Sequence, residues 1–404
     1  MKVDVQSLGT FNDLAHEGAQ QATGSLAQMT GMEAEVEVTK ISLVDRADVG
    51  EELGNDRYVG VSFDFEGALA GETVLAFDEP SKETITEALV PGDEADEAMA
   101  RSSVEEIGNI MMSGFIDGWA DYLGATIDHS PPTYIERTGP DVLPAPPAGT
   151  ERDHIFVFRS QVEWVDETIC FYIYMLPEYD SLTGLLGEHA DAESDAIPIE
   201  KLETFNRMTR SGTQTAADNL GMMAGVDVEA EVTRISFAPI EDVPKQVGTE
   251  TYVGTVVEFT GLPSGFLLVL FDEPSAINVA EALMPVDPDG EGLTDQHTAA
   301  IEELGNIMTS GFVDGWANVL QQSVEHTPPR LVHDMGRAII DPLAAQLGQH
   351  QRHAFIIDSR MQTESLAFES EILALPNEAE LRQALQELQV DRADQTEADV
   401  EQIF

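Results

Sequence analysis

Residues 105–132 read EEIGNIMMSGFIDGWADYLGATIDHSPP, and residues 302–329 read EELGNIMTSGFVDGWANVLQQSVEHTPP. The two stretches are identical at 17 of 28 positions and lie 197 residues apart. A shorter match, FDEPS at residues 77–81, returns at residues 271–275. A repeat period of this length corresponds to a whole domain and not to one unit of a solenoid. We therefore predict two tandem copies of one fold.

The chain of 404 residues is long enough for two or three domains of ordinary size. We predict that residues 1–190 form module 1 and that residues 199–404 form module 2, which includes a C-terminal helix. Residues 191–198 are the expected acidic linker, and the junction lies in the small, polar and acidic stretch Glu188–Asp195, which overlaps it.

Hydrophobic periodicity predicts the order helix, three strands, helix, and it predicts this order twice in each module. Such an order indicates the α+β class, with long helices packed on a mostly antiparallel sheet and a pseudo-two-fold axis inside each module. In module 2, Leu381, Leu385 and Leu388 share one face of the expected C-terminal helix, so this helix should pack. The elements expected in module 1 are helices at 11–29, 80–89 and 96–123, a last short helix from after Pro177 to Leu186, and strands at 34–43, 58–65, 73–77, 133–137, 155–160 and 168–174.

The composition excludes several functions. The chain has 75 acidic and 20 basic residues, and its net charge of −55 opposes binding to nucleic acid or to anionic lipid. No run of 18 apolar residues exists and the N-terminus lacks a secretory pattern, so we expect a cytoplasmic protein without membrane insertion. Cys170 is the only cysteine, which excludes internal disulfides and thiolate metal sites.

The acidity also indicates an environment. Only five of the basic residues are lysines, at positions 2, 40, 82, 201 and 245. Together, the high acidity and the shortage of lysine resemble proteins of salt-in halophiles such as haloarchaea. An ordinary acidic protein of a mesophile is the alternative, although such proteins usually keep many lysines.

The helix expected at residues 96–123 carries the candidate chemistry. Ser102, Glu106 and Asn109 lie at i, i+4 and i+7 and therefore share one stripe of this helix. Glu303 and Asn306 recur at the matching positions of module 2. A polar stripe is often only a solvated face, and the same Glu-x2-Asn spacing also occurs by chance at 52–55 and 203–206. Its retention within the best-preserved stretch of the repeat favours a functional role.

Glycines at helical positions are a second feature of this stretch. Each glycine inside a helix costs about 1 kcal/mol relative to alanine. We interpret Gly114 and Gly118 as sites of close packing, whereas Gly108 could leave room for another backbone at the stripe. The matching positions of module 2 are Gly305, Gly311 and Gly315.

At these residues the sequence resembles the CheC/CheX/FliY phosphatases of bacterial and archaeal chemotaxis. The family pattern is Asp or Ser, then x3-Glu-x2-Asn-x22-Pro, and both modules resemble CheC over nearly their full length. Module 2 departs from the pattern at its leading position, where Ala299 replaces Ser or Asp. The pattern is carried by Ser102, Glu106, Asn109 and Pro132 in module 1 and by Glu303, Asn306 and Pro329 in module 2.

The resemblance implies an activity. Family members remove the phosphoryl group from the aspartate of phosphorylated CheY, a response regulator, which makes the chain an expected hydrolase. In this reading Asn109 and Asn306 orient the attacking water, while Glu106 and Glu303 contact a lysine of the partner. Mg²⁺ is expected on the CheY partner, and no cofactor is expected on this chain. The alternative is a non-catalytic adaptor that binds CheD, CheY or the motility switch.

CheC commonly carries a second Glu-x2-Asn pair on the first helix of the module, and this chain does not. The aligned positions are Asp13 and His16 in module 1 and Arg207 and Arg210 in module 2, so neither offers the amide. Two sites therefore remain of four. His129 and its counterpart His326, just before each Pro-Pro pair, are expected to have structural roles.

Raising the KCl concentration from dilute to molar should strongly stabilise the fold, because the Debye length shrinks from about 10 Å at 0.1 M to about 3 Å at 1 M. Relief of about 3 kcal/mol of self-repulsion would raise Tm by roughly 6–12 °C, at about 2–4 °C per kcal/mol. Thermal unfolding followed by circular dichroism measures this shift. A Tm indifferent to salt would contradict the halophile interpretation.

Overall fold

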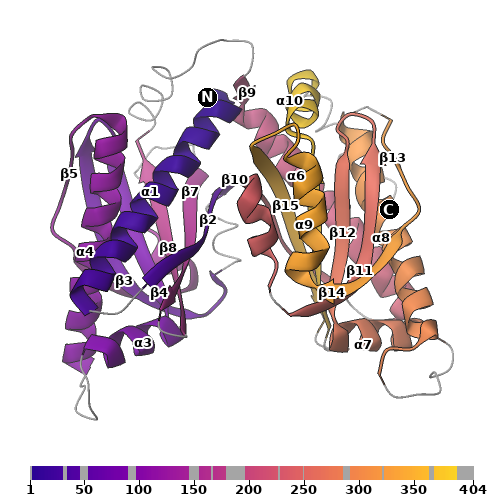
Figure 1. The fold of residues 1–404 in the computed structure, drawn as a ribbon, viewed down its shortest axis with the longest axis horizontal. Coiled ribbons are helices and arrows are strands. Elements are labelled where there is room, and N and C mark those ends of the chain that lie inside the picture. Colours follow the sequence, from indigo (N-terminus) through magenta and orange to yellow (C-terminus); the bar gives the residue numbers. More distant parts are fainter. Residues whose placement is uncertain are drawn as a thin grey trace. The chain divides into compact units, whose positions relative to one another are not determined.

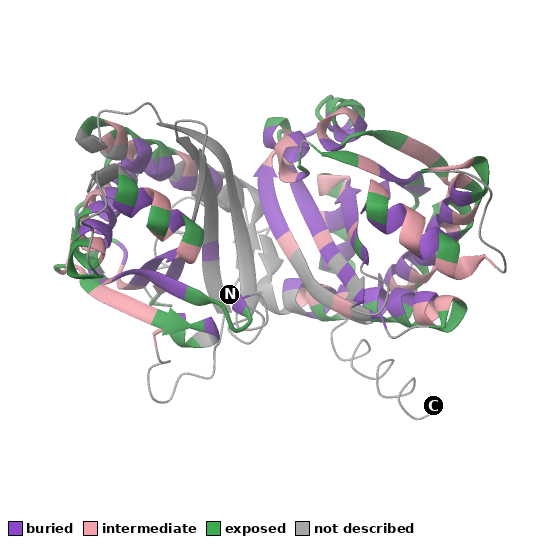
Figure 2. Ribbon diagram, turned by 90° about the horizontal axis from the view of Figure 1, so that it is seen from below, coloured by how far each residue is buried: buried purple, intermediate pink, exposed green. Residues whose placement is uncertain are grey.

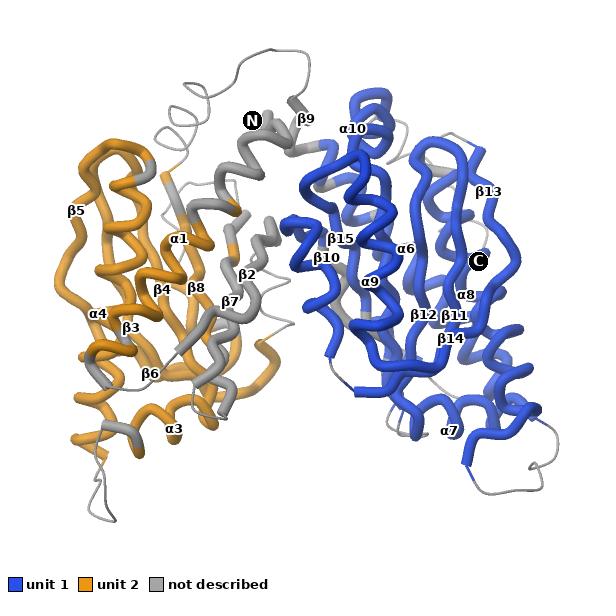
Figure 3. Tube along the Cα trace, in the orientation of Figure 1, with its two compact units in different colours: residues 1–5, 194–404 blue, residues 6–193 orange. Residues whose placement is uncertain are grey.

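The computed structural model describes residues 2–30, 34–45, 53–89, 97–144, 154–164, 167–178, 196–225, 228–248, 250–284, 292–320, 323–363 and 368–388. The chain divides into two compact units (Figure 3). Residues 6–193, orange in that figure, form the N-terminal unit, and residues 194–404 together with residues 1–5 form the C-terminal unit. Each unit combines helices with an antiparallel sheet and belongs to the α+β class (Figure 1).

The N-terminal unit contains two long helices and a short one. Helix α1 covers Val5–Thr30, so it starts one residue before the unit, and α4 covers Glu97–Leu123. The short helix α3 has Asp78 just before it, and the Oδ1 atom of Asp78 accepts a bond of 2.9 Å from the main-chain N of Ser81, which stabilises the helix start. The remaining elements are α3 (Glu79–Leu89), β2 (Ala34–Asp45), β3 (Arg57–Gly67), β4 (Gly71–Asp78), β5 (Ile127–His129), β6 (Thr133–Thr138), the 3-10 helix η1 (Gly139–Val142), β7 (His154–Trp164) and β8 (Glu167–Pro177).

The strand order of this unit has internal symmetry. The sheet runs β2-β7-β8-β4-β3, with β5 and β6 both paired to β3, and every pairing described is antiparallel. With β6 included, the order is β2-β7-β8-β4-β3-β6. Replacing β2, β3 and β4 by β6, β7 and β8, and the reverse, gives the same order read from the other end. The pseudo-two-fold arrangement expected from the sequence is therefore present in the sheet.

The C-terminal unit repeats this architecture. Its long helices are α6, Ile199–Ala224, and α8, Asp295–Leu320. Its strands are β10 (Glu229–Pro239), β11 (Thr251–Thr260), β12 (Gly265–Asp272), β13 (Glu325–His326), β14 (Arg330–Met335), β15 (His353–Thr363) and β16 (Phe368–Pro376). The order β10-β15-β16-β12-β11, with β13 and β14 paired to β11, matches that of the N-terminal unit. The shorter helices are η2 (Ile240–Gln246), α7 (Glu273–Leu283), α9 (Gly336–Leu347) and α10 (Glu378–Glu387).

Two short strands lie at the start of the C-terminal unit. Strand β9, Ala196–Pro198, pairs antiparallel with β1, Lys2–Asp4. These strands include the last three residues of the expected linker and explain why the first five residues group with this unit. The rest of the linker lies outside the described residues.

The long helices bury one face and approach each other closely. On α4, Ile107, Met111, Phe115 and Trp119 are buried, and burying each apolar side chain contributes roughly 1.5–3 kcal/mol. Trp316 of α8 is likewise buried and contacts the rings of Phe205, Phe259 and Phe312. In Figure 2 the inner strands of the C-terminal unit are mostly buried, while its helices alternate buried and exposed residues.

Glycines make the helix contacts possible. A Cβ atom at Gly118 would lie 3.1 Å from the Cα of Gly18, and one at Gly114 would lie 3.1 Å from the main-chain N of Ala22. Both glycines therefore pack α4 against α1, as expected. The expectation for Gly108 is wrong: it is buried, and a Cβ there would lie 2.4 Å from the Cγ2 of Val61, so it packs α4 on its own strand β3.

The opposite face of the two sheets is covered differently. In the C-terminal unit, α9 places Ile340 and Leu343 in one core cluster with Leu268 and Leu373 of the sheet. In the described part of the N-terminal unit, only η1 lies at the matching place, and its Val142 belongs to a separate core cluster of that unit. The sequence gives a reason, since prolines at 140, 144, 146 and 147 disfavour a helix there.

Most expected elements are observed. The helices and strands of the N-terminal unit agree within a few residues, except that α1 begins at Val5, six residues before the expected start. Leu381, Leu385 and Leu388 are buried as the C-terminal helix requires. The sequence did not predict β1, β5, β9, β13, η1, η2 or α9. The short helix expected after Pro177 and the chain beyond residue 388 lie outside the described residues. None of the helices within the described ranges is long and apolar enough to cross a membrane.

A pair of glycine substitutions tests the packing of α4. Gly108→Ala should destabilise the fold by about 1–3 kcal/mol, because its methyl group collides with Val61. Gly24→Ala on α1 is the control, since nothing lies within 4 Å of its Cβ position, and it should stabilise by up to about 1 kcal/mol. Denaturant unfolding in molar KCl measures both changes, and equal effects of the two substitutions would contradict this packing.

Candidate functional site

The candidate site of the N-terminal unit is the outward stripe of α4. Ile107 and Met111 are buried and lie on the face of α4 that packs on the core. The opposite face of the helix therefore directs its side chains to solvent. Ser102 and Glu106 are exposed and Asn109 is half-buried, as the sequence predicted for an accessible stripe. A carboxylate and an amide thus lie one helical turn apart on an accessible surface.

The C-terminal unit presents the same stripe on α8. Glu303 is exposed and Asn306 is half-buried, matching the burial of their counterparts. Ala299, at the place of Ser102, is also exposed and offers no polar atom. Pro132 and Pro329 are half-buried in the segments that follow β5 and β13. Two similar stripes are therefore formed, which differ at their first position.

The segment that carries Pro132 is fixed to the edge of the sheet. The main-chain N of Ser130 donates to the O of Asp64 at 2.8 Å, and the Oγ of Ser130 accepts from the N of Asp64 at 3.0 Å. Thr327 makes the same two bonds to Glu258 in the other unit, at 2.9 and 3.1 Å. The segments that carry the prolines are thus held in the same way in both units.

The two histidines that precede the prolines contact the site helices. His129 Nε2 lies 3.3 Å from Ser113 Oγ, and His326 Nε2 lies 3.3 Å from Ser310 Oγ. The ring of His129 also meets the ring of Phe63 edge-on, with centroids 5.7 Å apart. These contacts agree with the structural role expected for both histidines.

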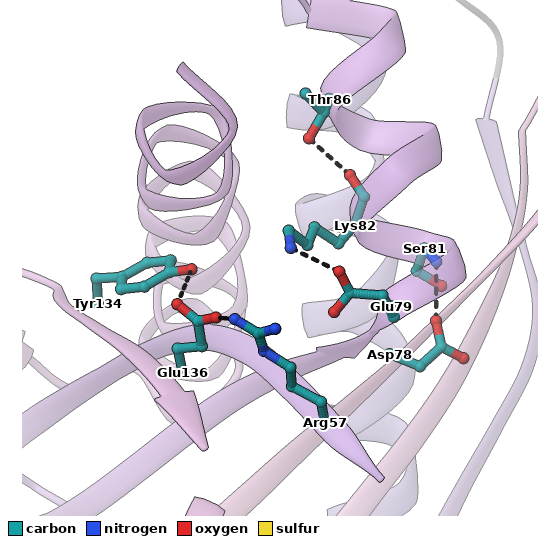
Figure 4. A network of polar contacts seen from close by, with 8 residues as sticks. All are labelled: Arg57, Asp78, Glu79, Ser81, Lys82, Thr86, Tyr134 and Glu136. Carbon is teal, nitrogen blue, oxygen red and sulfur yellow. Dashed lines mark hydrogen bonds and ion pairs between the residues drawn. The ribbon is translucent and has the colours of Figure 1, made fainter. Parts of the chain in front are cut away.

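A cluster of charged and polar side chains lies next to Arg101 of α4, and Figure 4 draws its other members. The Arg101 guanidinium lies 4.5 Å from the centre of the Tyr134 ring. Arg101 directly precedes Ser102 in the chain. The Tyr134 hydroxyl donates to Glu136 at 3.4 Å, and Glu136 also pairs with Arg57. On α3, Lys82 pairs with Glu79 at 2.6 Å. We call Arg57, Glu79, Lys82, Arg101, Tyr134 and Glu136 the polar cluster.

Burial and charge act in opposite directions on Tyr134. Desolvation raises the pKa of its hydroxyl above the ordinary value, and the nearby Lys82, Arg101 and Arg57 reduce this increase. Tyr134 therefore stays neutral at physiological pH and can donate its proton to Glu136.

The polar cluster belongs to the N-terminal unit. At the positions of Arg57, Lys82, Arg101 and Tyr134, the C-terminal unit has uncharged side chains. Among the described residues, the two stripes therefore differ in electrostatic surroundings. In the C-terminal unit, the residues that match Arg57, Lys82, Arg101 and Tyr134 are, in that order, Thr251, Ala276, Thr298 and Leu331.

The first helices offer different chemistry. On α1, His16 is half-buried and its Nε2 lies 2.7 Å from the Nε2 of Gln20, while the Asp13 side chain lies outside what the structure describes. On α6, Arg207 is exposed and Arg210 is half-buried. Asn206 is half-buried, and nothing is described of the Glu203 side chain. Neither helix presents a described carboxylate–amide pair.

Within the described ranges, no three His, Cys, Asp or Glu side chains are placed to hold a metal ion. The stripes offer a carboxylate, which accepts hydrogen bonds or pairs with a cation, and an amide, which both donates and accepts. Such groups can orient a water and contact a charged partner.

Two features were missed by the sequence reasoning. Ser113 and Ser310 lie four residues after the asparagines, on the same stripes and inside the retained stretch, so their position was a usable signal. The Arg101–Tyr134 contact joins residues 33 positions apart, and no sequence pattern indicated it.

Comparisons with known proteins agree on one family. A model described as "CheC-like family" matches residues 99–136 and 297–333, which contain both stripes. A protein of Halobacterium salinarum, named "Putative CheY-P phosphatase CheC1", is 35% identical over 189 residues, which cover 46% of this chain and 94% of that protein.

Two solved structures also match about one unit each. FliY of Thermotoga maritima is 20% identical, with a TM-score of 0.39, over 46% of this chain and 97% of FliY. The chemotaxis protein CheX of Vibrio vulnificus is 16% identical, with a TM-score of 0.29, over 41% of this chain and 93% of CheX.

Proposed function

Since the chain belongs to the CheC-like family, we propose that it dephosphorylates CheY-P, the activity in the name of its Halobacterium relative. The observation that carries the proposal is the presentation of one accessible Glu-x2-Asn pair on the long helix of each unit, with the same burial in both. The substrate is the aspartyl phosphate of the partner, and the products are inorganic phosphate and the free aspartate.

The role of Asn109 and Asn306 follows from the reaction. A water must attack phosphorus in line with the bond between phosphorus and the aspartate oxygen, which breaks as the carboxylate leaves. Positioning dominates such a step, because little covalent work is required of the protein. An amide can accept a hydrogen bond from the water through Oδ1 and donate one through Nδ2, so it can fix the water's direction without acting as a base.

Glu106 and Glu303 are proposed to hold the partner. Each lies one turn before the asparagine and is exposed. A carboxylate there can form a charge-assisted bond with a lysine beside the partner's phosphoaspartate, which would set the register of the asparagine. We place Mg²⁺ on the partner in this scheme, where it would neutralise the phosphoryl oxygens.

The units are proposed to contribute unequally. Ser102 is a polar side chain at the start of the α4 stripe, whereas Ala299 has none on α8. We therefore assign the larger share of the activity to the N-terminal unit. The acidity of the chain and its similarity to a Halobacterium protein support a reaction that runs in molar salt.

A non-catalytic adaptor is the second candidate. It is favoured by the loss of the amide at the first-helix positions, where His16 and Arg210 stand instead. Such a protein would bind CheY, CheD or the motility switch through the same exposed helices without hydrolysis. The two retained asparagines favour the phosphatase.

Replacing both asparagines should abolish stimulated dephosphorylation. Asn109→Ala with Asn306→Ala should lower kcat at least about 100-fold, because alanine cannot orient a water. The fold should remain intact, since alanine improves helix propensity by a few tenths of a kcal/mol. Decay of phosphorylated CheY in molar KCl with Mg²⁺ measures the rate, and Asn109→Ala alone should cost more than Asn306→Ala alone.

Asn55→Ala is the matched control for this test, because Asn55 is exposed and ends a chance Glu-x2-Asn spacing outside the site helices. It should leave the rate unchanged. A double variant at Asn109 and Asn306 that keeps the wild-type rate would rule out these sites.

Replacing the glutamates should affect binding more than chemistry. An exposed ion pair contributes up to about 1 kcal/mol, roughly fivefold in an equilibrium constant. Glu106→Ala with Glu303→Ala should therefore raise KM about two- to fivefold, and kcat should change less. Glu302→Ala removes an exposed carboxylate beside the α8 stripe and serves as the control for Glu303→Ala, because the matching Glu105 pairs with Arg101 at 3.2 Å. Equal KM values for these two single variants would argue against this role.

A further inference from the structure

A serine and a histidine join each site helix to the segment that carries the proline. Ser113 of α4 and His129 of β5 form one pair, and Ser310 of α8 and His326 of β13 form the other. Both pairs have the same Oγ–Nε2 distance, 3.3 Å, and both histidines place Nδ1 3.0 Å from the carbonyl oxygen of the next residue. We call these the serine–histidine pairs.

The positions of the protons determine the direction of the hydrogen bonds that each histidine ring makes. A carbonyl oxygen can only accept, so Nδ1 of each histidine must carry a proton and donate to Ser130 or Thr327. In a neutral imidazole Nε2 is then an acceptor, and the Ser113 hydroxyl is the donor that faces it. The Ser310 hydroxyl has one proton and two acceptors, the main-chain oxygen of Asn306 at 2.8 Å and His326 Nε2 at 3.3 Å, so it shares that proton between them. The ring thus bridges the main-chain carbonyl of the next residue and a helix hydroxyl.

The serines also connect to the asparagines. Ser113 lies four residues after Asn109 and therefore on the same stripe, one turn further along α4. In the other unit, Ser310 Oγ lies 2.8 Å from the main-chain oxygen of Asn306, as well as 3.3 Å from His326. One hydroxyl thus touches the backbone of the candidate asparagine and the ring that precedes the prolines.

The histidines are anchored from the side of the sheet. Ser130 and Thr327, directly after them, each make two bonds to the neighbouring strand, and the prolines at 132 and 329 follow within two residues. The segment is thus tied to the sheet by its backbone and to the site helix by the imidazole. The serine–histidine pair is the tie between the two sides of the site.

We propose that the serine–histidine pairs are positioning elements, which set the asparagine-bearing turn against the proline-bearing segment. This inference rests on the proposed phosphatase activity. Loss of the tie should let the turn and the segment shift relative to each other, and misplacement by about 1 Å can cost about 100-fold in rate. Binding of the partner through Glu106 and Glu303 should be little affected, because these residues lie one to two turns away from the serines.

The test compares two substitutions of nearly equal shape. Ser113→Val with Ser310→Val removes the hydroxyls, whereas Ser113→Thr with Ser310→Thr keeps them, and both double variants add the same β-branching. The threonine variant should keep kcat within about twofold of wild type, and the valine variant should lose about tenfold or more, with KM for phosphorylated CheY unchanged. Equal Tm values in molar KCl confirm that the fold is intact.

Several outcomes would overturn the inference. If both double variants keep the wild-type kcat, or lose it equally, the hydroxyl does not position the site. If kcat falls only together with Tm, the pair stabilises the fold and does nothing more. If the wild-type chain never accelerates CheY-P decay, the proposed function fails, and this result is distinct from an active wild type with an equally active valine variant.

A spectroscopic measurement examines the pair without catalysis. Ring ¹⁵N chemical shifts of His129 and His326 should be recorded at increasing pH until they no longer change, which identifies the neutral rings. We expect the proton on Nδ1 and a bare Nε2 in both. The opposite tautomer in either histidine would overturn the bonds on which this inference depends.

Discussion

The structure depends on one constraint: each long site helix must bury a continuous apolar face on an antiparallel sheet. On α4 this face runs from Ile107 to Trp119, and Gly108 brings the helix onto Val61 of β3. Gly114 and Gly118 then let α1 pack alongside. With these sides fixed, Ser102 and Glu106 are exposed and Asn109 stays partly accessible, so the packing of the core also creates the candidate site.

The same constraint explains how far the sequence alone was informative. The helix stripe and the order of helices and strands along each repeat follow from periodicity and from the match between the two halves. Neither β5 nor β13 could be foreseen, because they are only three and two residues long and owe their form to pairing with β3 and β11. The same holds for the serine–histidine pairs, whose members meet through that pairing.

Differences between the two units show what the fold tolerates. The N-terminal unit has η1 where the C-terminal unit has the twelve-residue α9, and the prolines after Gly139 account for this exchange. The polar cluster beside α4 has no charged counterpart at the four positions that match Arg57, Lys82, Arg101 and Tyr134. The glutamate, asparagine, serine and histidine of each site are nevertheless present in both. Retention of these side chains amid such changes is what a shared chemical role requires.

The central claim is that the exposed stripes act as a catalyst and not only as a binding surface. Turnover tests this most directly: phosphorylated CheY is mixed with a substoichiometric amount of the wild-type chain in molar KCl and Mg²⁺, and phosphate release is followed over time. The account predicts release of many phosphates per chain, at an initial rate proportional to the chain concentration. Binding of CheY without faster phosphate release, or release that stops at the number of sites, would contradict it.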